Sequence, residues 1–582
     1  MSDPPGNILY YGDNLDVLRQ HVPDESVDLV YLDPPFKSDQ DYNVLFAEHS
    51  GAASAAQIKV FTDTWQWDQA AARAYEKTVE AGGDESRTMQ AFRTILGTSN
   101  LLAYLAMMAP RLIELRRVLK GTGSLYLHCD PTASHYLKLL LDAVFGPENF
   151  RNEIIWRRTG AHGPRRSFGP IHDTLLFYSK SSAYYFRVVR RPYMRGHVET
   201  RYKLQPDGRS KFVTGGNILT GAGTTHGESG QPWQGFDPSA KGRHWAVPGD
   251  LAEQMPPEFG ALGVIEKLDA LYAAGLVEIK LGAEWPWPVR YLKQGDGQPL
   301  SDLWASQPYT GSYAKGVQGT VQGSTADIDA DVQWLGRTDP ERLGYPTQKP
   351  IGLLARIIKA SCPGDGLVLD PFCGCGTTIE AAQRLGRRWV GIDITALATS
   401  LIKVRLRDAF GDAAQFYTVG EPITTTEAAE LAATDPYQFQ WWALGLVGAR
   451  PIDEKKGADK GIDGRIYFHD QAGGKTKQVI LSVKAGKVQV QHLRDLRGVL
   501  DREEAQIGVL VSLQPSTQPM RTEAASAGFY ESPWGKHPRL QLLTVEELLD
   551  GERIDMPPQQ SSVTFKRAPK AKKEQDEPDP LF

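Results

Sequence analysis

Apolar residues near the start of the chain form short continuous runs that are separated by a segment with helical spacing. The runs at residues 8–11 and 27–32 predict two β-strands, and residues 15–20 between them have the periodicity of a short helix. The second run ends abruptly at the turn Asp33-Pro34-Pro35-Phe36. The start of the chain therefore predicts a strand, a helix and a second strand that leads directly into a turn with two consecutive prolines.

Alternating helices and strands recur further along the chain. Residues 101–119 repeat apolar positions at helical spacing and stop at Lys120-Gly121-Thr122-Gly123, a typical helix end, after which residues 124–128 predict a strand. A later region predicts a helix, a strand, a helix and a strand at residues 351–360, 367–369, 377–385 and 389–392. The last three of these form a βαβ unit, which is typical of an α/β fold.

The remaining patterns divide the chain into five parts. Residues 1–180 and 345–425 carry the two regions of alternating helices and strands, and residues 181–344 between them are rich in Gly, Pro, Trp and Tyr without sustained periodicity. We expect this middle part to be an irregular insertion. Residues 430–553 predict a separate small α/β domain, and residues 556–582, rich in Pro, Lys and Glu, predict a disordered tail.

Composition narrows the class of protein. With 41% hydrophobic and 23% charged residues in a chain of 582, a soluble globular protein of two or three domains is expected. Residues 1–7 show no targeting pattern and no apolar run is long enough to span a membrane, so we expect a cytoplasmic protein without a membrane partner. The four cysteines are too few for a disulfide framework, and no Cys or His set has zinc-ligand spacing, so we expect no metal there.

A glycine-rich turn, Asp370-Pro371-Phe372-Cys373-Gly374-Cys375-Gly376-Thr377-Thr378, lies directly between a predicted strand and a predicted helix. Glycines there let the backbone bend sharply and approach a ligand closely. Asp393 closes the next predicted strand, at a distance that fits an acid bonded to ribose hydroxyls. The turn lacks the third glycine of the dinucleotide fingerprint and the Gly-Lys-Ser/Thr of a phosphate loop. Glycine turns are more often only structural, but this combination favours a nucleoside without a phosphate chain.

The turn Asp33-Pro34-Pro35-Phe36 also follows a predicted strand, where ligands of open α/β sheets bind, and its prolines make the backbone rigid. The structural alternative is a turn with an aspartate cap. An exocyclic amino group is a poor nucleophile because its lone pair is delocalised into the ring. The carboxylate of Asp33 and the carbonyl of Pro34 can accept its hydrogens and orient it toward a methyl donor, and Phe36 can stack on a base extruded from the duplex.

Together the two motifs resemble those of amino-group DNA methyltransferases of the β arrangement, in which Asp-Pro-Pro-Phe/Tyr precedes Asp-Pro-Phe-x-Gly-x-Gly-Thr-Thr. Further similar motifs span residues 12–14, 168–178, 302–304 and 345–350, so the resemblance covers most of residues 1–425. It implies an α/β fold with a Rossmann-like S-adenosylmethionine-dependent methyltransferase sheet and helices on both of its faces. It also implies that the insertion at residues 181–344 recognises the target sequence in double-stranded DNA.

The resemblance assigns residues to the site. It implies that Asp33, Pro34, Pro35 and Phe36 hold the base, and that the cofactor S-adenosylmethionine is surrounded by a second set. That second set is Asp13, Lys349, Pro350, Asp370, Phe372, Gly374, Gly376, Thr377 and Asp393. Asp rather than Ser at the first position of the proline motif resembles enzymes that methylate adenine at N6 more than those that methylate cytosine at N4. Methylation at cytosine C5 needs a cysteine nucleophile, usually in a Pro-Cys dipeptide, and the chain has no Pro-Cys.

One segment is strongly basic although the whole chain has a net charge of −5. Residues 151–211 contain fourteen Lys and Arg residues against four Asp and Glu residues, a local net charge of +10. Arginines such as Arg157 and Arg158 are interspersed with aromatic residues such as Trp156 and Tyr184, which suits phosphate contacts and base stacking. A solvated face is the ordinary explanation of a charge run, but beside a base-modifying site we expect DNA contact.

In the C-terminal part, Asp463 precedes one predicted strand and Lys484 lies on the next. In metal-dependent nucleases, carboxylates hold Mg²⁺ while a lysine orients the attacking water. The segment resembles the Mrr-like restriction-endonuclease fold over roughly residues 430–553. It departs from the pattern at Ser482, where active members carry Glu, Asp or Gln as a metal ligand, and a serine hydroxyl binds Mg²⁺ poorly. A domain that cleaves DNA with Mg²⁺ and a degenerate DNA-binding domain both stay open.

Three readings of the whole chain follow. We expect a site-specific DNA methyltransferase; the first alternative is a bifunctional restriction-modification enzyme whose C-terminal domain also cleaves DNA. The second alternative is a catalytically silent DNA-binding protein. Methylation of RNA or of protein glutamine is disfavoured because those enzymes usually place the cofactor motif before the proline motif. A homodimer and a restriction partner subunit remain open.

Overall fold

The computed structural model describes residues 6–35, 42–47, 53–61, 67–158, 168–192, 201–206, 210–212, 219–292, 297–306, 329–336, 338–343, 345, 347–452, 461–471, 475–558 and 569–571. The chain forms two compact units. Unit 1 comprises Met1–Arg187, Ser301–Ser306 and Asp331–Glu574, and unit 2 is centred on Val188–Leu300. No helix among the described residues is long and apolar enough to cross a membrane.

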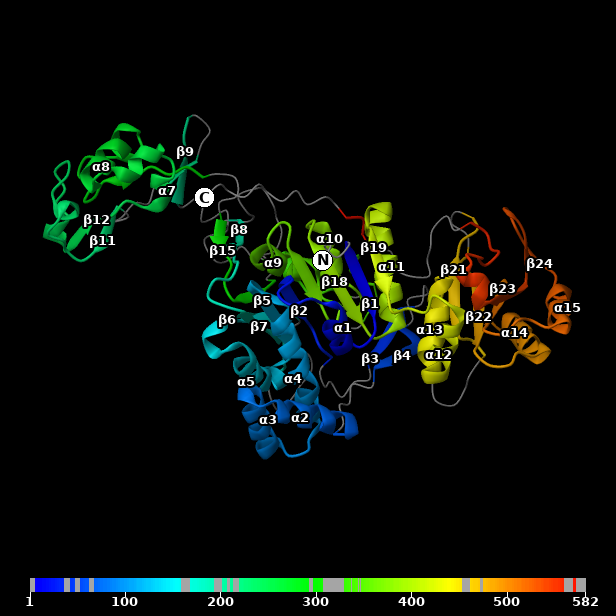
Figure 1. Ribbon diagram of the computed structural model, residues 1–582. Helices are drawn as coiled ribbons and strands as arrows, with labels where there is room; N and C mark the ends of the chain where they lie inside the picture. The colour runs from blue at the N-terminus through cyan, green and yellow to red at the C-terminus, as the bar shows by residue number, and fades with distance from the viewer. Residues whose placement is uncertain are drawn as a thin grey trace. The chain divides into compact units, whose positions relative to one another are not determined.

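Unit 1 contains a nine-stranded sheet with the order β16-β6-β7-β5-β2-β17-β18-β1-β19 (Figure 1). The strands are β1 (Asn7–Tyr11), β2 (Val27–Leu32), β5 (Leu119–Cys129), β6 (Phe150–Arg157), β7 (His172–Ser179), β16 (Leu303–Ala305), β17 (Leu367–Asp370), β18 (Arg388–Asp393) and β19 (Phe416–Val419). Strand β7 is antiparallel to both neighbours, and the other neighbouring pairs are parallel. Strands from the two ends of the sequence therefore alternate in the middle of the sheet.

Helices cover both faces of this sheet, as the α/β pattern predicts. One core contains residues of α1 (Asn14–His21), α2 (Gln69–Ala81), α3 (Gly83–Leu96), α4 (Asn100–Val118) and α5 (Pro131–Phe145). The other contains residues of α9 (Ile351–Ser361), α10 (Thr377–Arg384) and α11 (Ala396–Phe410). Strand β2 is buried along its whole length and divides its side chains between the two cores: Val30 and Leu32 face the first, Leu29 and Tyr31 the second. Each fully buried aliphatic side chain stabilises the fold by about 1.5–3 kcal/mol. The Rossmann-like fold class is thus confirmed.

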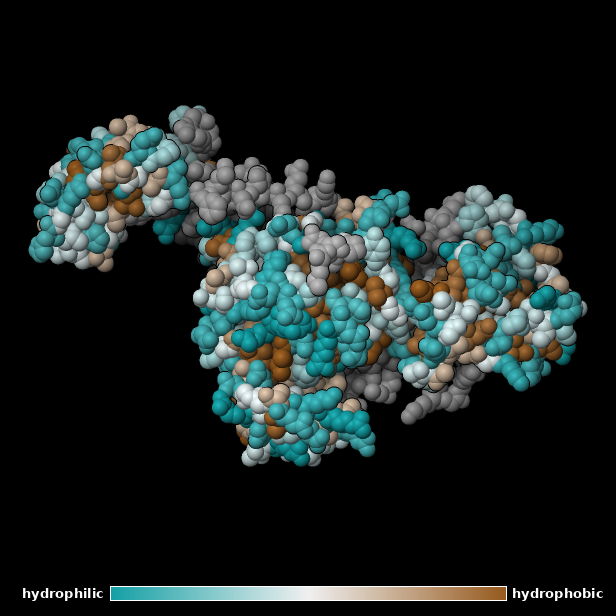
Figure 2. Space-filling view, in the orientation of Figure 1, coloured by the Kyte–Doolittle hydropathy of each residue, from teal (hydrophilic) through white to brown (hydrophobic). Residues whose placement is uncertain are grey.

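Helices α2 and α3 illustrate how amphipathic spacing directs this packing. Their apolar residues Tyr75, Met89 and Phe92 are buried in the first core. The outward faces of the same helices are largely hydrophilic in the space-filling view (Figure 2). The helices therefore cover the sheet on one side and meet water on the other.

Strand β5 starts earlier than its sequence predicts. The segment 120–123 was expected to end a helix, with the strand beginning at residue 124, but β5 already begins at Leu119. Leu119 is buried and pairs with Val27, and the register with β2 then shifts before Leu29 pairs with Ser124. The irregularity accommodates the Gly-rich segment inside the strand, because β-bulges absorb extra residues.

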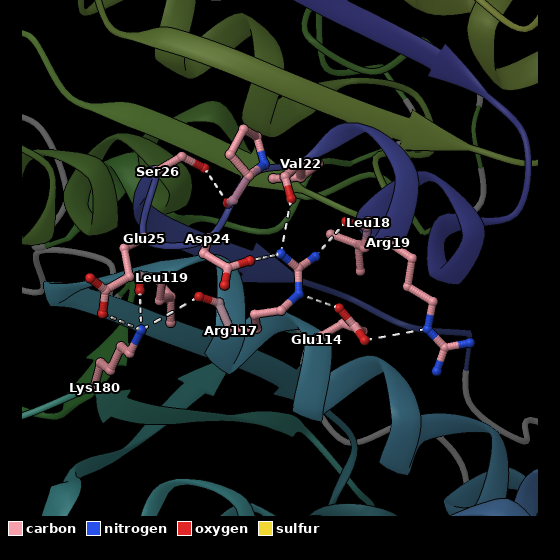
Figure 3. A network of polar contacts seen from close by, with 11 residues as sticks. Leu18, Arg19, Val22, Asp24, Glu25, Ser26, Glu114, Arg117, Leu119 and Lys180 are labelled. Carbon is pink, nitrogen blue, oxygen red and sulfur yellow. Dashed lines mark hydrogen bonds and ion pairs between the residues drawn. The ribbon is translucent and has the colours of Figure 1, made fainter. Parts of the chain in front are cut away.

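A network of polar contacts lies at the amino end of β2, at the opposite edge from the Asp-Pro-Pro turn (Figure 3). The Arg117 guanidinium donates to the carbonyl oxygens of Leu18 (2.6 Å) and Val22 (3.2 Å), to Glu114 Oε2 (2.6 Å) and to Asp24. The two carbonyls belong to the C-terminal end of α1 and the residue that follows it, so a cation there satisfies acceptors that the helix leaves unpaired.

The C-terminal part of unit 1 has the α/β character that the sequence predicts. Its five-stranded sheet has the order β20-β21-β22-β23-β26, and helices α12 to α16 accompany it. The strands are β20 (Arg450–Pro451), β21 (Gly464–Phe468), β22 (Lys477–Lys484), β23 (Ile507–Ser512) and β26 (Leu540–Thr544). The helices are α12 (Thr425–Thr434), α13 (Pro436–Leu446), α14 (Val490–Arg502), α15 (Gln518–Ser526) and α16 (Val545–Leu549).

The described residues of unit 2 are irregular, as the lack of periodicity predicts, with strands of two or three residues and one longer helix, α8 (Val264–Ala273). It nevertheless has a hydrophobic core of its own. Trp233 and Trp245 lie in that core with Leu268, and their indole nitrogens donate to Asp269 Oδ1 (2.8 Å) and to the Gln231 carbonyl (2.7 Å). Buried tryptophans with satisfied N–H groups can order a segment that has little regular structure.

The predicted tail, residues 556–582, lies mostly outside the described residues. Residues 569–571 are described, and they contact the helices beside the large sheet. The Ala571 amide donates to the Ala409 carbonyl (3.0 Å), and Arg384 donates to the Pro569 carbonyl (3.3 Å).

Candidate active site

Four aspartates stand at the carboxyl ends of four neighbouring parallel strands, in the order β2, β17, β18 and β1. Asp33 follows β2, Asp370 ends β17, Asp393 ends β18, and Asp13 follows β1. In Figure 1, β18 lies beside β1, a strand from the opposite part of the chain. Residues from both ends of the chain therefore meet at one edge of the sheet, which is where open α/β sheets bind ligands.

The Asp33 carboxylate contacts the ammonium group of Lys349. Lys349 lies just before α9, and its side chain is only 9% exposed, against 25% for Asp33. The same ammonium lies 3.3 Å from the Thr347 carbonyl oxygen. Pro34 is buried and Pro35 half-buried, whereas Phe36, predicted to stack on the base, lies outside the described residues.

The glycine-rich turn is held by its own backbone and by Asp370. The Phe372 amide donates to Asp370 Oδ1 (3.0 Å), and the Gly376 amide donates to the Cys373 carbonyl (2.7 Å). Gly374 and Gly376 have φ angles of +50° and +77°, which other residues rarely adopt. A Cβ atom on Gly374 would lie 3.3 Å from the Tyr345 ring. The turn is therefore tightly fitted, and α10 begins directly after it at Thr377.

Asp393, the predicted ribose acid, is engaged inside the protein. Its Oδ2 accepts from the Gly374 amide (2.9 Å), and its Oδ1 accepts from the amide (2.9 Å) and hydroxyl (2.8 Å) of Thr395. The carboxylate thus braces the glycine turn. Carboxylate oxygens carry further lone pairs, so a hydrogen bond from a ribose hydroxyl stays a prediction.

Asp13, also predicted to surround the cofactor, caps α1 by accepting from the Leu15 amide (2.8 Å), and it pairs with Arg111 at 2.8 Å. Arg111 also donates to Asn14 Oδ1 (2.6 Å), and Asn14 in turn donates to the Pro371 carbonyl (2.8 Å). This chain connects α4 and α1 to the glycine turn. Asn14 and Arg111 were not among the predicted site residues, although Asn14 belongs to the Gly-Asp-Asn motif.

The strand ends are strongly acidic. Burial raises the pKa of Asp370 to about 7, and the nearby Asp33 adds to this effect. Burial likewise raises the pKa of Asp393 to about 6, although the hydrogen bonds from Thr395 and Gly374 oppose the shift. Carboxylates concentrated beside backbone with positive φ suit a ligand that carries positive charge and approaches closely. The positively charged sulfur of S-adenosylmethionine and its nucleoside fit this donor set.

A buried ion pair supports the glycine turn from behind. Arg405 on α11 and Glu380 on α10 contact each other, and their side chains are 1% and 0% exposed. Arg405 Nη1 also donates to the Cys375 carbonyl (3.1 Å) and to Thr377 Oγ1 (3.2 Å). Sequence reasoning missed this pair. The available signal was that Arg405 shares a helix face with the apolar residues Leu401, Ile402 and Ala409.

The two residues predicted for a nuclease site also lie together. Asp463 Oδ2 accepts from the Ser482 hydroxyl (3.1 Å) and the Val483 amide (2.6 Å), and Lys484 Nζ lies 3.6 Å from it. Asp463 is thus hydrogen-bonded to β22, the strand on which an active nuclease would carry a second metal ligand, at position 482. Among the described residues, no group of three or more His, Cys, Asp or Glu residues could hold a metal ion.

The sheet order defines a Rossmann-like α/β fold with an acidic edge at the carboxyl ends of its central strands. A family model described as DNA methylase, of the N6 and N4 methyltransferases, matches residues 27–403. The chain belongs to this family, and it is an S-adenosylmethionine-dependent DNA methyltransferase of the adenine-N6 or cytosine-N4 type. A second model, described as NACHT-associated inactive Restriction Endonuclease 1, matches residues 437–550.

Individual relatives agree with the family. The chain is 26% identical over 404 residues to the type II methyltransferase M.EcaI of Enterobacter cloacae, with 69% of each chain covered. It is 25% identical over 452 residues to the StyLTI Mod subunit, a type III restriction-modification enzyme of Salmonella typhimurium. That match covers 74% of this chain and 58% of the relative, so the chain spans little more than half of the Mod subunit. A DNA modification methylase from Thermus thermophilus, solved with S-adenosyl-L-methionine, covers 71% of this chain and all of its own at 14% identity and a TM-score of 0.31.

Proposed function

We propose that this methyltransferase modifies adenine at N6, at specific sites in double-stranded DNA. The observation that carries the proposal is the contact between Asp33 and Lys349 beside the glycine turn, because it brings the base motif and the cofactor motif to one edge of the sheet. Aspartate at the first position of Asp-Pro-Pro-Phe favours adenine N6 over cytosine N4.

The cofactor is proposed to lie along the carboxyl ends of β17, β18 and β1. The residues that would hold it are Asp13, Lys349, Pro350, Asp370, Phe372, Gly374, Gly376, Thr377 and Asp393. S-adenosylmethionine supplies a methyl group on a positively charged sulfur. The acids at the strand ends stabilise that charge, and the glycine turn allows the backbone to approach the nucleoside.

The base is proposed to leave the duplex and enter the site beside the proline turn. Asp33 and the Pro34 carbonyl accept hydrogen bonds from the amino group, which turns the nitrogen lone pair toward the methyl group. Pro35 keeps the turn rigid, and Phe36 stacks on the base. No covalent bond between protein and base is needed, which agrees with the absence of a Pro-Cys dipeptide.

Residues 181–344 are proposed to recognise the target sequence, and the basic segment 151–211 to contact phosphates. Within that segment Arg158 directly follows β6, and Arg190 and Arg191 lie on the short strand β8 (Arg190–Pro192). Arginine side chains interspersed with aromatic residues suit binding to phosphates and to unstacked bases.

For the C-terminal domain, whose fold we propose to be Mrr-like, we favour DNA binding without cleavage over Mg²⁺-dependent cleavage. Asp463 is already bonded to Ser482 and Val483, and residue 482 is not an acid. The match to an inactive restriction-endonuclease family supports the same choice. Incubation of unmethylated DNA with the full chain and Mg²⁺ tests it: intact DNA is expected, and cuts at defined sites would establish the bifunctional alternative.

Two partner proposals remain separate from the chemistry. The Mod subunits among the relatives support a restriction partner subunit, which co-purification from the source cells would detect. A homodimer is tested by light scattering of the purified chain with and without DNA.

Two experiments test methylation and its target. Modification-aware sequencing of DNA from cells that express the chain should find N6-methyladenine at one sequence motif. Tritium from labelled S-adenosylmethionine should reach DNA with the wild-type chain and not with Asp33→Ala. If no label reaches DNA, the chain is a silent DNA-binding protein; if the modified base is N4-methylcytosine, the adenine proposal is wrong.

A further inference from the structure

Three polar side chains are buried together beneath the proline turn. They are Tyr31 on β2, His128 on β5 and Asp173 on β7, and these strands are neighbours in the sheet. The Tyr31 hydroxyl lies 2.9 Å from His128 Nδ1, and His128 Nε2 lies 3.2 Å from Asp173 Oδ2. The three residues are 2%, 1% and 5% exposed.

The hydrogen positions in this network follow from chemistry. An ionised carboxylate only accepts hydrogen bonds, so His128 Nε2 must carry the proton that faces Asp173. In a neutral imidazole Nδ1 is then an acceptor, and the Tyr31 hydroxyl must donate to it. Burial alone would raise the pKa of Asp173. The hydrogen bond from His128 and the positive charges of Lys349 and Arg158 instead hold that pKa below its ordinary value. Asp173 thereby fixes the ring and, through it, the Tyr31 hydroxyl.

The position of Tyr31 connects this network to the proposed base-binding residue. Side chains on a strand alternate between faces, so Tyr31 and Asp33 point to the same side of β2. Tyr31 packs in the core that contains α9, and Asp33 contacts Lys349, which lies two residues before that helix. Asp33 is close enough to help raise the pKa of Tyr31, after burial as the main cause. A change in the Tyr31 ring therefore acts directly on the backbone that enters the proline turn.

Stability alone does not require this arrangement. Polar groups are costly to bury, and an apolar set of the same volume is often as stable as a satisfied polar network. Hydrogen bonds within such a network do restrict its members to one orientation, and the other oxygen of Asp173, Oδ1, lies 3.3 Å from Arg158 Nη1. The network lies directly below a group that must be aligned with a reacting nitrogen, where a misplacement of about 1 Å can cost on the order of 100-fold in rate.

We propose that Tyr31, His128 and Asp173 are positioning residues for methyl transfer, which hold the end of β2 so that Asp33 meets the amino group of the extruded base. The inference rests on the proposed function, because it assumes that Asp33 binds the base. The network touches neither the base nor the cofactor, and it acts through Asp33. Its loss should therefore change the rate of transfer more than the affinity for either ligand.

Two substitutions of His128 distinguish its hydrogen bond to Tyr31 from its hydrogen bond to Asp173. An asparagine amide can take the position of Nδ1 and keep the bond to Tyr31, whereas a glutamine amide reaches the position of Nε2 and keeps the bond to Asp173. If the hydrogen bond between Tyr31 and His128 positions Asp33, His128→Gln and Tyr31→Phe should lower kcat by about 10- to 100-fold. His128→Asn should retain more activity than His128→Gln. The KM for DNA and the Kd for S-adenosylmethionine should stay within about threefold of the wild type.

A matched control is available on the adjacent strand. Tyr126 pairs in register with Tyr31, is equally buried and bonds its hydroxyl to Ser361 Oγ (2.8 Å), with no link to Asp33. Tyr126→Phe removes the same atom at the same cost in burial, and its kcat should remain near that of the wild type. A DNA substrate with 2-aminopurine at the target adds a second readout, because its fluorescence reports extrusion of the base.

The outcomes are distinct. Wild-type kcat in both Tyr31→Phe and His128→Gln would overturn the inference while leaving the proposed function intact. So would a joint loss of kcat, cofactor affinity and thermal stability that Tyr126→Phe shares, because that pattern is purely structural. If the wild-type chain itself transfers no methyl group to DNA, the proposed function is wrong and the inference falls with it.

Discussion

The ammonium group of Lys349 contacts the carboxylate of Asp33, although 316 residues separate them in the sequence. The contact exists because β2 and β17 are neighbouring parallel strands and α9 begins just after Lys349. A single cation thus bridges the proline turn and the segment before α9, the two parts of the chain to which we assign base and cofactor binding. Any base that reaches Asp33 must share the carboxylate with this lysine.

Replacing Lys349 by methionine should therefore impair methyl transfer. The substitution keeps an unbranched apolar side chain and removes the charge, so Asp33 loses the partner that orients it. We expect kcat to fall by about 100-fold, the usual cost of removing one electrostatic contact at a reacting centre. Steady-state kinetics with a saturating DNA duplex measures the effect. Lys349→Arg restores the charge in another geometry and should recover only part of the rate; full activity in Lys349→Met would contradict this role.

Gly374→Ala should weaken cofactor binding. Gly374 has a φ of +50°, and an added Cβ would lie 3.3 Å from the Tyr345 ring, so the turn must shift. A left-handed alanine alone costs about 1–2 kcal/mol. We expect the Kd for S-adenosylmethionine, measured by calorimetry, to rise at least about tenfold.

Gly364→Ala provides the control for that substitution. Gly364 precedes β17 at the other end of the strand, and a Cβ there would meet no atom within 4 Å. Its Kd should match the wild type. Equal effects of the two alanines would mean that the fit of the glycine turn does not determine affinity.

The affinity for S-adenosylmethionine should fall as the pH is lowered. Burial raises the pKa of Asp370 to about 7 and that of Asp393 to about 6. As pH falls from 8 to 5.5, both carboxylates gain protons and lose the charge that attracts a sulfonium. The affinity for S-adenosylmethionine should fall by roughly tenfold, whereas that for S-adenosylhomocysteine, whose sulfur is neutral, should change much less. Parallel pH curves for the two ligands would contradict this explanation.

The raised pKa of Asp370 affects folding stability in the opposite direction, because it favours the folded state at low pH. A buried acid whose pKa is raised from 3.8 to about 7 stabilises the folded state at low pH, and this stabilisation is lost as pH rises through 7. Asp370→Asn cannot titrate. The unfolding free energy of this variant relative to the wild type should therefore increase between pH 5 and pH 8. Denaturant unfolding at several pH values measures the difference, and a constant difference would mean that Asp370 does not titrate in this range.

The sequence was sufficient to place Asp33 and Asp370 after predicted strands and, through the family resemblance, in one site; that their strands β2 and β17 are direct parallel neighbours is a finding of the structure. The sequence also predicted most elements of the large sheet and the small α/β domain. It did not predict the pair Arg405 and Glu380 or the network of Tyr31, His128 and Asp173. These groups depend on which strands and helices become neighbours in three dimensions, and periodicity does not encode that. The core of unit 2 was missed for a similar reason, since its tryptophans follow no repeat.

Asp463→Ala should destabilise the C-terminal domain without creating or abolishing a nuclease. Asp463 accepts from the Val483 amide and the Ser482 hydroxyl, so its removal leaves two donors of β22 unpaired. Each lost hydrogen bond to a charged group costs about 1.5–3 kcal/mol. Limited proteolysis should cleave residues 430–553 faster in this variant, while methyl transfer persists. Mg²⁺-dependent DNA cleavage that disappears in the variant would contradict our assignment of this domain.

Arg117→Ala should reduce stability and leave the chemistry unchanged. Arg117 binds two carbonyls at the end of α1 together with Asp24 and Glu114, at the amino end of β2 and far along that strand from Asp33 (Figure 3). Its removal should lower the unfolding free energy by about 2–3 kcal/mol, because acceptors near a helix end lose a charged donor. Arg19 in the same network is 48% exposed, and its pair with Glu114 is at 3.3 Å, so Arg19→Ala should cost less than about 1 kcal/mol. Thermal unfolding ranks the two variants, and both should bind S-adenosylmethionine as the wild type does. We assign the Arg117 network at the amino end of β2 to stability and Asp33 at its carboxyl end to chemistry. A loss of cofactor affinity in folded Arg117→Ala would contradict this assignment.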